Sequence, residues 1–348
     1  MNAPLTTLSR TTVTVPAYAK INLTLELLGV RPDGYHDLRS VVVPVELHDD
    51  VEISVSPANG DGRTAFGQNL SLETIADGVS ISNLGPAEKN LAVRAARLFL
   101  DSLCESCESC ESKSRDVSFC IPRSAFCIHL TKRIPLGGGL GGGSADAAAV
   151  LRGLNTLLPS LAPGHSPLAT SELMEMGAEL GSDIPAMVHG GTVLMEGRGE
   201  RVSPLRGPDG RSPLPPLFVL LANPGTHVST AEAYRETSAV LTSPAFSCNI
   251  LSSPHCVGSA SAFAAWLFNG LEGAVFARHP EVAALAARLR EAGAPAVLMS
   301  GSGATVFALF DDAASAERVR RGLPPECWCT VTRLLPDGVM AAHGPLEA

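Results

Sequence analysis

The stretch with the strongest chemical signal is Gly137–Gly143, in which six of seven residues are glycine. It follows a predicted strand over residues 126–130 and precedes an alanine-rich segment that predicts a helix. Glycines let main-chain N–H groups turn inward without side chains in the way, and a helix N-terminus adds unsatisfied donors and partial positive charge. The pattern therefore predicts an anion site, and a nucleoside triphosphate is the expected guest.

This loop differs from the two commonest phosphate-binding loops. No Gly-Lys-Ser/Thr follows its glycines, as the common phosphate loop requires. Its glycines also outnumber those of a dinucleotide-binding turn. A flexible surface linker is the alternative, but linkers rarely lie between a strand and a strong helix former.

Three polar residues elsewhere are candidates for chemistry. Residues 21–27 alternate in polarity, so Lys20 and Asn22 share one face of a predicted strand. Asp183 lies at a predicted helix start, directly before Ile184-Pro185. The plain alternatives are a solvated strand face for the first two and a helix N-cap for Asp183. As a functional group, Asp183 would accept a proton from a substrate hydroxyl.

Two further parts of the sequence, a predicted turn and a predicted helix start, carry polar or aromatic side chains with plain structural explanations. Pro32-Asp33-Gly34 predicts a tight turn that presents Tyr35 and His36 just beyond a hairpin. An aromatic ring beside an imidazole can stack on a base and hydrogen-bond to it, although a packed hairpin end explains the pair equally well. Asn90 opens an amphipathic helix predicted over residues 90–100, where its plain role is a cap.

Bulk composition sets the class of protein. The 348 residues suggest about two domains, and 45% hydrophobic with 18% charged residues is typical of a soluble globular protein. The net charge of −9 argues against a nucleic-acid partner held through phosphates. We see no membrane-spanning run and no convincing leader, which favours a cytoplasmic, bacterial protein.

The nine cysteines include Cys104, Cys107 and Cys110 in a three-residue repeat. Such spacing is compatible with zinc or an iron–sulfur cluster. A low-complexity insertion with reduced, exposed thiols explains the repeat more simply, so we assign no metal site to the chain. The odd, clustered count indicates a reducing compartment.

The predicted elements fall into two parts. In the first part, strands are expected over 12–17, 21–27, 41–47, 51–55 and 126–130, and helices over 90–100, after the glycine loop and over 171–180, with Pro44 marking a bulge or an edge. Residues 206–216 contain four prolines and two glycines and predict the boundary between domains 1–205 and 206–348. The second part alternates four strands (217–222, 296–299, 304–310, 328–333) with helices over 231–239, 266–277, 280–292 and 313–321, which indicates an α+β sandwich. Thr230 is a candidate cap of the helix over 231–239.

Several motifs together resemble those of the GHMP kinases. Residues 135–144 are similar to their phosphate-binding motif, residues 17–23 to their first motif and residues 299–304 to their C-terminal glycine motif. Residues 180–185 are similar to the segment that holds their catalytic aspartate, and residues 90–96 to their adenine-side helix. The Gly34-Tyr35-His36 element resembles the branch that phosphorylates 4-diphosphocytidyl-2-C-methyl-D-erythritol rather than the mevalonate-type relatives.

The resemblance implies a two-domain GHMP kinase fold, with an N-terminal domain like domain 2 of ribosomal protein S5 and a ferredoxin-like C-terminal domain. It also implies transfer of phosphate from ATP, with Mg²⁺, to the 2-hydroxyl of the cytidine diphosphate-linked polyol, in the non-mevalonate route to isoprenoid precursors. The expected protein is a monomer or a weak homodimer with no nucleic-acid or membrane partner.

Residue roles follow from the same resemblance. Asp183 would take the proton of the acceptor hydroxyl, and Lys20 would align that hydroxyl with the γ-phosphate. Asn22, Tyr35, His36 and Thr230 would contact the substrate. The residues implied at ATP are Asn90, Lys132, Pro135, Leu136, Gly137, Gly138, Gly139, Leu140, Gly141, Gly142, Gly143, Ser144 and Ala145.

Two departures from the family pattern are visible. The cysteine-rich stretch near 101–123 has the character of an insertion. Residues 269–272 read Asn-Gly-Leu-Glu where the family has Asn-Asp-Leu/Phe-Glu, which removes a carboxylate expected near a helix start. Neither proposed catalytic residue is lost.

Two alternative functions remain. One is another GHMP kinase, acting on homoserine or a mevalonate derivative. The other is a catalytically silent nucleotide-binding regulator.

Overall fold

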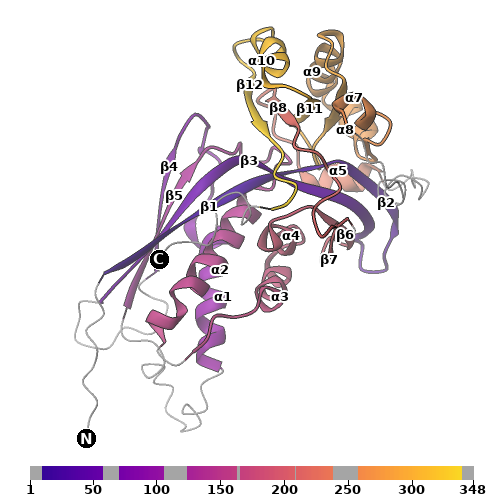
Figure 1. Cartoon of the computed structure of the whole chain (residues 1–348). Coiled ribbons are helices and arrows are strands. Elements are labelled where there is room, and N and C mark those ends of the chain that lie inside the picture. The colour runs from indigo at the N-terminus through magenta and orange to yellow at the C-terminus, as the bar shows by residue number, and fades with distance from the viewer. Residues whose placement is uncertain are drawn as a thin grey trace, which may run out of the picture.

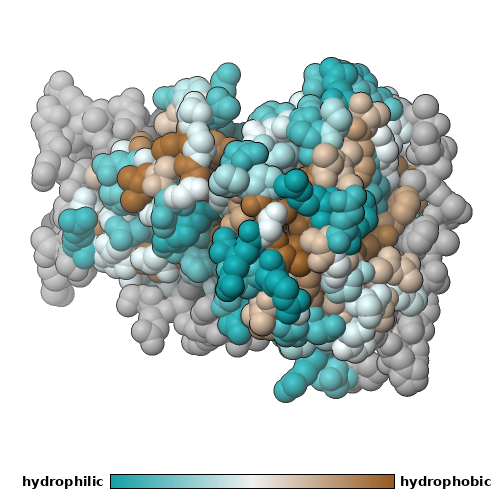
Figure 2. Space-filling view, turned by 90° about the horizontal axis from the view of Figure 1, so that it is seen from above, coloured by the Kyte–Doolittle hydropathy of each residue, from teal (hydrophilic) through white to brown (hydrophobic). Residues whose placement is uncertain are grey.

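The computed structural model describes residues 10–57, 70–105, 124–162, 165–207, 209–237 and 258–338. Figure 1 shows two sheets stacked on each other, with helices below the long first sheet and above the second. Among the described helices, none combines the length and apolarity needed to cross a bilayer. Seen from above, apolar residues reach the surface in patches separated by hydrophilic ones (Figure 2).

The first sheet contains eight of the described strands. They are β1 (Thr11–Asn22), β2 (Thr24–Val30), β3 (His36–Pro57), β4 (Leu70–Ala76), β5 (Ser124–Lys132), β6 (Val193–Gly197), β7 (Arg201–Pro204) and β9 (Phe268–Asn269). The sequence predicts two short strands in place of β3, but one continuous strand pairs with β1, β2, β5 and β6. The β1–β3 register shifts between Tyr18 and Lys20, opposite His48 and Pro44, which confirms the irregularity predicted at Pro44.

Four helices cover one side of the first sheet, with the third packed on the other three. They are α1 (Leu91–Glu105), α2 (Gly142–Leu161), α3 (Thr170–Leu180) and α4 (Ile184–His189). The alanines of α2 allow close approach, and a Cβ at Gly153 would lie 2.7 Å from Ile53 of β3. The helix predicted over 90–100 extends to Glu105, so the predicted insertion begins inside α1. Residues 106–123, which hold most of that insertion, lie outside the described residues.

The second sheet has the antiparallel order β10-β11-β8-β12. Its strands are β8 (Phe218–Asn223), β10 (Ala296–Met299), β11 (Val306–Phe310) and β12 (Trp328–Arg333). The helices of this half are α5 (Thr230–Thr237), α7 (Ala260–Phe263), α8 (Glu272–Arg278), α9 (Pro280–Glu291) and α10 (Ala313–Arg321). With α9 and α10 packed on one face of the sheet, this is the ferredoxin-like arrangement predicted for this half.

Two helix predictions in this half are wrong in detail. The helix expected over 266–277 starts only at Glu272, because Phe268 and Asn269 pair with β2 as strand β9. Thr230 does not cap α5, since it is the first residue of that helix. Ser229 caps instead: its hydroxyl accepts from the N–H of Glu232 at 3.4 Å, and its carbonyl accepts from the N–H of Ala233.

The two sheets share an apolar core. Side chains alternate along a strand, so Leu220 and Ala222 of β8 face α9 and α10, whereas Val219 and Leu221 face the first sheet. There they join Ile21 of β1 in a cluster of fully buried residues. The two sheets are therefore joined by a continuous hydrophobic contact.

The predicted boundary at residue 206 lies in the connection between β7 and β8, but later segments return to the first sheet. Strand β9 pairs parallel with β2, and Leu334 bridges to Val45 of β3. The carbonyl of Pro336 also accepts from Thr192. The second half of the chain thus completes the first sheet.

Truncating a side chain in the shared core tests this coupling. We expect Leu221→Ala to lower the free energy of unfolding by about 2–5 kcal/mol, because it leaves a cavity where the sheets meet. Urea unfolding followed by fluorescence and by far-UV dichroism measures the loss. The matched control Val30→Ala, at a residue 52% exposed, should change stability by less than about 0.5 kcal/mol. Equal effects of the two variants would contradict a shared core.

Candidate active site

The glycine loop joins β5 to α2 with a strongly turned backbone. Gly137, Gly139 and Gly141 have φ values of 65°, 74° and 70°, a left-handed conformation that other L-residues rarely adopt. Gly138, between the first two, lies outside the left-handed region, so the backbone alternates there as it does in nests that bind anions. Gly141 is the N-cap of α2, so the loop leads directly to a helix N-terminus.

A second glycine turn, Ser300–Gly303, packs tightly against this loop. A Cβ at Gly139 would lie only 2.0 Å from the carbonyl oxygen of Ser300, so no other residue fits there. The Ser300 hydroxyl donates to the carbonyl of Gly139 at 3.0 Å. The Thr305 N–H donates to the carbonyl of Gly138 at 3.2 Å. The two glycine motifs, far apart in sequence, are one structural unit.

Two side chains at the start of α8 hold the second turn. The amide of Asn269 donates to the carbonyls of Met299 and Gly301, both at 2.8 Å. Glu272 accepts from the N–H of Met299 at 2.8 Å. These are the outer residues of the Asn-Gly-Leu-Glu sequence. Gly270 removes a carboxylate without disturbing either contact, and sequence reasoning missed the role of Asn269 and Glu272 in supporting the turn.

Lys20, Asn22 and Asp183 come together beside the loop. The Lys20 ammonium donates to Asn22 Oδ1 at 2.6 Å and lies 3.4 Å from Asp183 Oδ2. The N–H of Lys20 donates to the carbonyl of Leu140 at 3.0 Å, which ties β1 to the glycine loop. Both Lys20 and Asn22 are 4% exposed, so the solvated strand face is excluded.

Asp183 occupies the N-cap position of α4, but its side chain makes no capping hydrogen bond. Its carboxylate instead pairs with Lys20 and is 36% exposed. The Asp183 side chain therefore does not cap α4. A carboxylate that is held by a buried ammonium and still open to the cleft is placed to accept a proton.

Hydrogen bonds behind Asn22 fix its orientation. The Asn22 amide donates to Ser40 Oγ at 2.8 Å, and the Ser40 hydroxyl donates to the carbonyl of Thr24 at 2.5 Å. Because the amide nitrogen is engaged, Asn22 Oδ1 must face Lys20. The network joins β1, β2 and β3 beneath the site.

A cleft of about 300 Å³ opens over these groups. It is lined by Lys20, Asn22, Leu25, Leu38, Ser40, Leu91, Pro135, Leu136, Gly137, Gly138, Gly139, Gly141, Gly142, Gly143, Ser144, Asp183, Met195, Thr230, Tyr234, Gly301 and Ser302. A polar, glycine-rich wall thus faces the Lys20–Asp183 pair. A second hollow of about 690 Å³ shares Pro135 and Leu136 with this cleft.

The other predicted substrate residues lie at or near the cleft. Thr230 lines it, and its hydroxyl lies 2.9 Å from that of Ser302. His36 is buried, with its ring 5.5 Å from that of Tyr234, and its Nε2 has no hydrogen-bond partner among the described residues. Tyr35 is 57% exposed, and the Arg198 guanidinium lies 5.2 Å from its ring centre.

Tyr234 is a cleft residue that sequence reasoning missed. Burial, together with the nearby charge of Asp183, raises the pKa of its phenol above the ordinary value. The available signal was an aromatic residue in the first turns of the predicted helix 231–239. Helical spacing could not show that this ring faces His36, because the contact joins α5 to a strand from the other end of the chain.

Four residues predicted at the nucleotide have other contacts. Asn90 caps α1, accepting from the N–H of Ala92 at 2.9 Å. Leu140 and Ala145 are buried and do not line the cleft. Lys132 is fully buried beneath the loop, so its ammonium is not open to a ligand there. This burial favours a supporting role for Lys132 beneath the loop, and its predicted place near ATP stays a prediction.

Lys132 belongs to a buried ionic cluster under the loop. Its ammonium contacts the carboxylates of both Asp49 and Asp146. Asp49 also accepts from the N–H groups of Arg133 and Ile134, at the end of β5, and Asp146 lies in the first turns of α2. The cluster therefore holds both ends of the glycine loop.

Burial and charge shift the pKa values within this cluster. Burial raises the pKa of Asp146 to about 7, an effect that Lys132 reduces and Asp49 reinforces. Burial opposes the charge on Lys132, but its two carboxylate partners outweigh that effect and raise its pKa. The cluster thus pairs one ammonium with two carboxylates, and Asp146 is the carboxyl whose pKa is raised.

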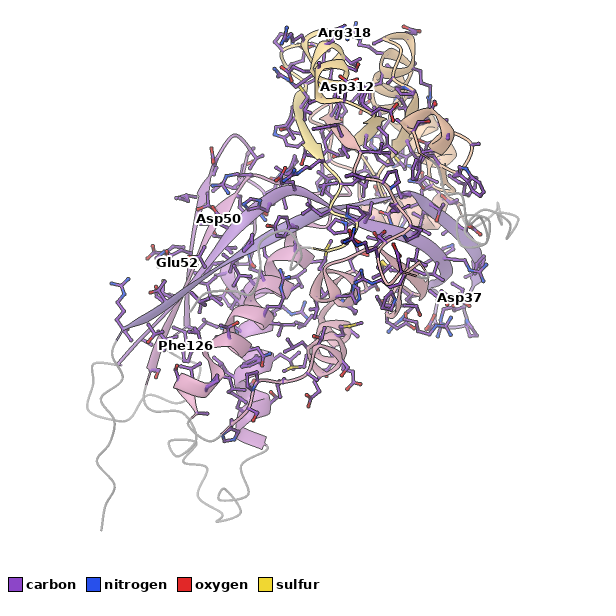
Figure 3. The ribbon with its side chains drawn as sticks, in the orientation of Figure 1. Asp37, Asp50, Glu52, Phe126, Asp312 and Arg318 are labelled. Carbon is purple, nitrogen blue, oxygen red and sulfur yellow. The ribbon has the colours of Figure 1, made fainter. Side chains whose placement is uncertain are left out.

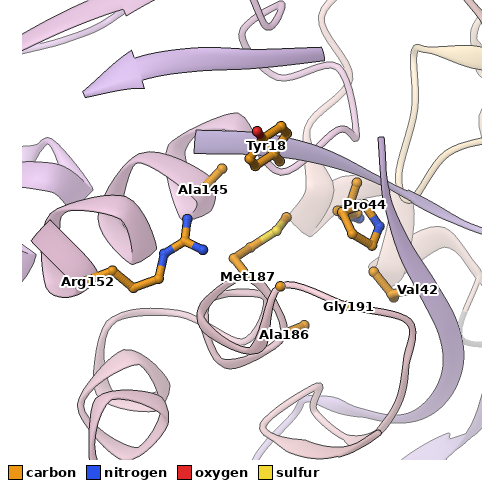
Figure 4. Close-up of a pocket in the computed structure, with 10 residues that line it drawn as sticks. Tyr18, Val42, Pro44, Ala145, Arg152, Ala186, Met187 and Gly191 are labelled. Atoms are coloured by element: carbon orange, nitrogen blue, oxygen red, sulfur yellow. The ribbon is translucent and has the colours of Figure 1, made fainter. Parts of the chain in front are cut away.

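A small cavity lies behind Lys20, between β1, β3, α2 and α4 (Figure 4). Its volume of about 10 Å³ has room for roughly one water molecule. Figure 4 shows Arg152 and Tyr18 on its wall. Burial lowers the pKa of Arg152 to about 10 and raises that of Tyr18 to about 12. This cavity is too small for a metabolite, so the substrate belongs in the larger cleft.

Removing the buried ammonium tests the role of the cluster. We expect Lys132→Met to lower the free energy of unfolding by about 3–5 kcal/mol, because two carboxylates lose their buried counter-ion. Chemical denaturation measures the change. The control Lys89→Met replaces an exposed lysine and should be nearly neutral. A small effect at Lys132 would show that the cluster contributes little to folding.

Asp146 should also leave a signature in the pH dependence of stability. Its pKa in the folded protein lies above its usual 3.8, so its stabilising contribution is complete below pH 3.8 and is lost as the pH rises through about 7. Asp146→Asn cannot titrate and should lack this decline. Unfolding free energies of both proteins across that range give the comparison. A constant difference between them would contradict the shift.

Comparisons with known proteins agree with this geometry. The GHMP kinases N terminal domain matches residues 90–191, and the GHMP kinases C terminal family matches residues 252–328. A 4-diphosphocytidyl-2-C-methyl-D-erythritol kinase from Pelotomaculum thermopropionicum is 40% identical over 88% of this chain and 92% of its own length. The enzyme of the same name from Deinococcus radiodurans is 37% identical over 91% and 92%.

Solved structures show the same fold. A crystal structure of 4-(cytidine 5'-diphospho)-2C-methyl-D-erythritol kinase has a TM-score of 0.66 and 30% identity, covering 92% of this chain and 98% of its own. Mevalonate kinase from L. major has a TM-score of 0.64 at 15% identity over 97% and 100%, which supports the fold alone. By its sequence relatives, its fold and its paired glycine turns, this chain belongs to the 4-diphosphocytidyl-2-C-methyl-D-erythritol kinase family of the GHMP kinases.

Proposed function

We propose that this protein transfers the γ-phosphate of ATP to the 2-hydroxyl of 4-diphosphocytidyl-2-C-methyl-D-erythritol. The observation that carries the proposal is the Lys20–Asp183 pair, which faces the glycine loop across one cleft. The names of the relatives supply the substrate, and the geometry supplies a phosphate cradle and a base.

The chemistry assigned to the pair follows from positions and charges. Asp183 accepts the proton of the acceptor hydroxyl while that oxygen forms a bond to the γ-phosphorus and the bond to the β-phosphate oxygen breaks. Lys20 holds the carboxylate and the acceptor oxygen in line. Phosphoryl transfer depends mainly on positioning and on neutralising charge, which a buried ammonium beside a helix N-terminus provides.

The triphosphate is assigned to the glycine loop and the N-terminus of α2. Main-chain N–H groups and the helix dipole stabilise its charge there. The hollow that shares Pro135 and Leu136 with the cleft offers room for the nucleoside.

The donor set fits Mg²⁺. Ser144 offers a hydroxyl at the cleft wall at the start of α2, and this cation takes few protein ligands beside phosphate oxygens. Bound there, Mg²⁺ would neutralise charge on the phosphates.

The cytidine end is assigned to His36, Tyr35 and Tyr234. A buried imidazole with an unpaired Nε2 can read the hydrogen-bonding edge of a base, and aromatic rings beside it can stack on its face. Asn22 and Thr230 lie nearer the phosphate loop and are assigned to the polyol.

An ATP-consumption assay with a panel of acceptors tests the proposal. We expect turnover with the cytidine diphosphate-linked polyol, a requirement for Mg²⁺, and little activity with mevalonate or homoserine. Activity with one of those two and none with the cytidine compound would assign the chain to another branch of the GHMP kinases. Nucleotide binding without turnover on any acceptor would indicate a regulator.

Variants at the pair test the mechanism. We expect Asp183→Ala to bind ATP normally while kcat falls by about 10²–10⁴-fold, the usual contribution of a positioned base. Lys20→Ala should lose a similar factor. Steady-state kinetics and calorimetric ATP binding separate the two effects. Asp209→Asn, in the loop before β8, is the matched control and should retain full activity. Near-normal turnover of Asp183→Ala would remove Asp183 from the mechanism.

A further inference from the structure

Three metal-binding side chains meet on the first sheet, outside the kinase cleft. Cys127 and His129 are two residues apart on β5 and therefore point to the same side. Glu73 of β4 is the direct partner of His129 in the parallel register. One ligand atom from each of the three lies within 4.8 Å of the others.

We propose that Glu73, Cys127 and His129 form a binding site for a divalent transition metal, with Zn²⁺ as the best-fitting ion. Thiolate, imidazole and carboxylate are the three donor types that zinc combines in proteins, and three protein ligands leave a fourth position for water. A hard cation such as Mg²⁺ is disfavoured by the sulfur and nitrogen donors.

The structure brings the donors close without strain on the strands. His129 Nδ1 lies 3.1 Å from Glu73 Oε2, so the two already form a cross-strand pair that a metal would bridge. Cys127 and His129 are half-buried, and Glu73 is exposed, so an ion can reach all three from solvent. A shallow hollow lined by Ser71 and Cys127 lies beside them and leaves space for a coordinated water.

Around the donors, the acidic side chains of Glu52 and Glu73 outnumber the one basic residue, Arg10, that lines the adjacent hollow. Glu52 of β3 is the partner of His129 on the other side of β5, so two acidic residues flank the imidazole. Figure 3 labels Glu52 and Phe126 on the long first sheet, away from the second sheet. Phe126 and Ile128 alternate with the donors and point into the helix-covered core, which fixes the donors on the opposite face.

Such a site would stabilise the edge of the first sheet. Strand β4 is the terminal strand and pairs only with β5 among the described strands. A metal held by Glu73 from β4 and by two residues from β5 would join the edge strand to its neighbour. Binding to the folded state alone would raise the melting temperature.

Zinc titration of the full-length protein, in competition with a chromophoric chelator, tests the proposal. Cys104, Cys107 and Cys110 are first replaced by serine, because their spacing alone is compatible with zinc, and Cys120, the next cysteine along the chain, is replaced with them. In that background we expect one zinc per chain. Adding Cys127→Ser or His129→Ala should weaken binding roughly tenfold or more, and Glu73→Gln should weaken it less.

Two further readouts identify the site. Co²⁺ should give a thiolate-to-metal absorption band in the background protein, and Cys127→Ser should abolish it. Zinc should raise the melting temperature of the background protein but not that of Cys127→Ser. The matched control Cys329→Ser, a half-buried cysteine on β12, should bind zinc unchanged. Absence of stoichiometric binding in the background protein, or binding that Cys127→Ser leaves intact, would overturn the proposal.

Discussion

The contact between the two glycine turns is the constraint on which the site depends. A Cβ at Gly139 would collide with the Ser300 carbonyl, and Lys20 and Asn22 lie within 3.4 Å of the Cβ position of Gly301. The glycine loop, the second turn and Lys20 are therefore packed so closely that a shift of one requires a shift of the others. Asn269 and Glu272 extend this constraint to α8.

Charge beneath the loop complements this packing. Lys132 neutralises carboxylates at both ends of the loop, whereas Lys20 keeps its ammonium at the cleft wall. The two buried lysines look alike in sequence, since each lies near the end of a strand. Their roles differ because Lys132 has two carboxylate partners in the core and Lys20 has one partner that is open to the cleft. Only the three-dimensional placement of Asp49 and Asp146 distinguishes them.

Much of the fold and part of the site could be predicted from the sequence. Periodicity indicated α1, α3 and the strands of the second sheet, because these elements bury regular apolar faces. It divided β3 into two, since the polar residues His48, Asp49 and Asp50 interrupt the apolar pattern, whereas the pairing with β1 continues through them. Periodicity also missed β9, whose two residues are extended because they pair in parallel with β2.

For the site, residue type and spacing indicated the loop, Lys20, Asn22 and Asp183. Resemblance to a family supplied their roles. Tyr234, Asn269 and Glu272 were missed because their functions arise from contacts with distant segments, which local sequence does not encode. The ionic partners of Lys132 were missed for the same reason: a lysine shortly before a loop carries no sign that two buried carboxylates contact it.

The apolar core shared by the two sheets has a consequence for motion. Leu221 and Phe307 are fully buried against the first sheet, so a hinge rotation of one sheet relative to the other would expose them to water. Opening and closing of the cleft must then be carried by short connections and side chains at its rim. The elements that line the cleft are therefore ordered in the folded protein before a ligand binds, so binding restricts little further motion of the backbone.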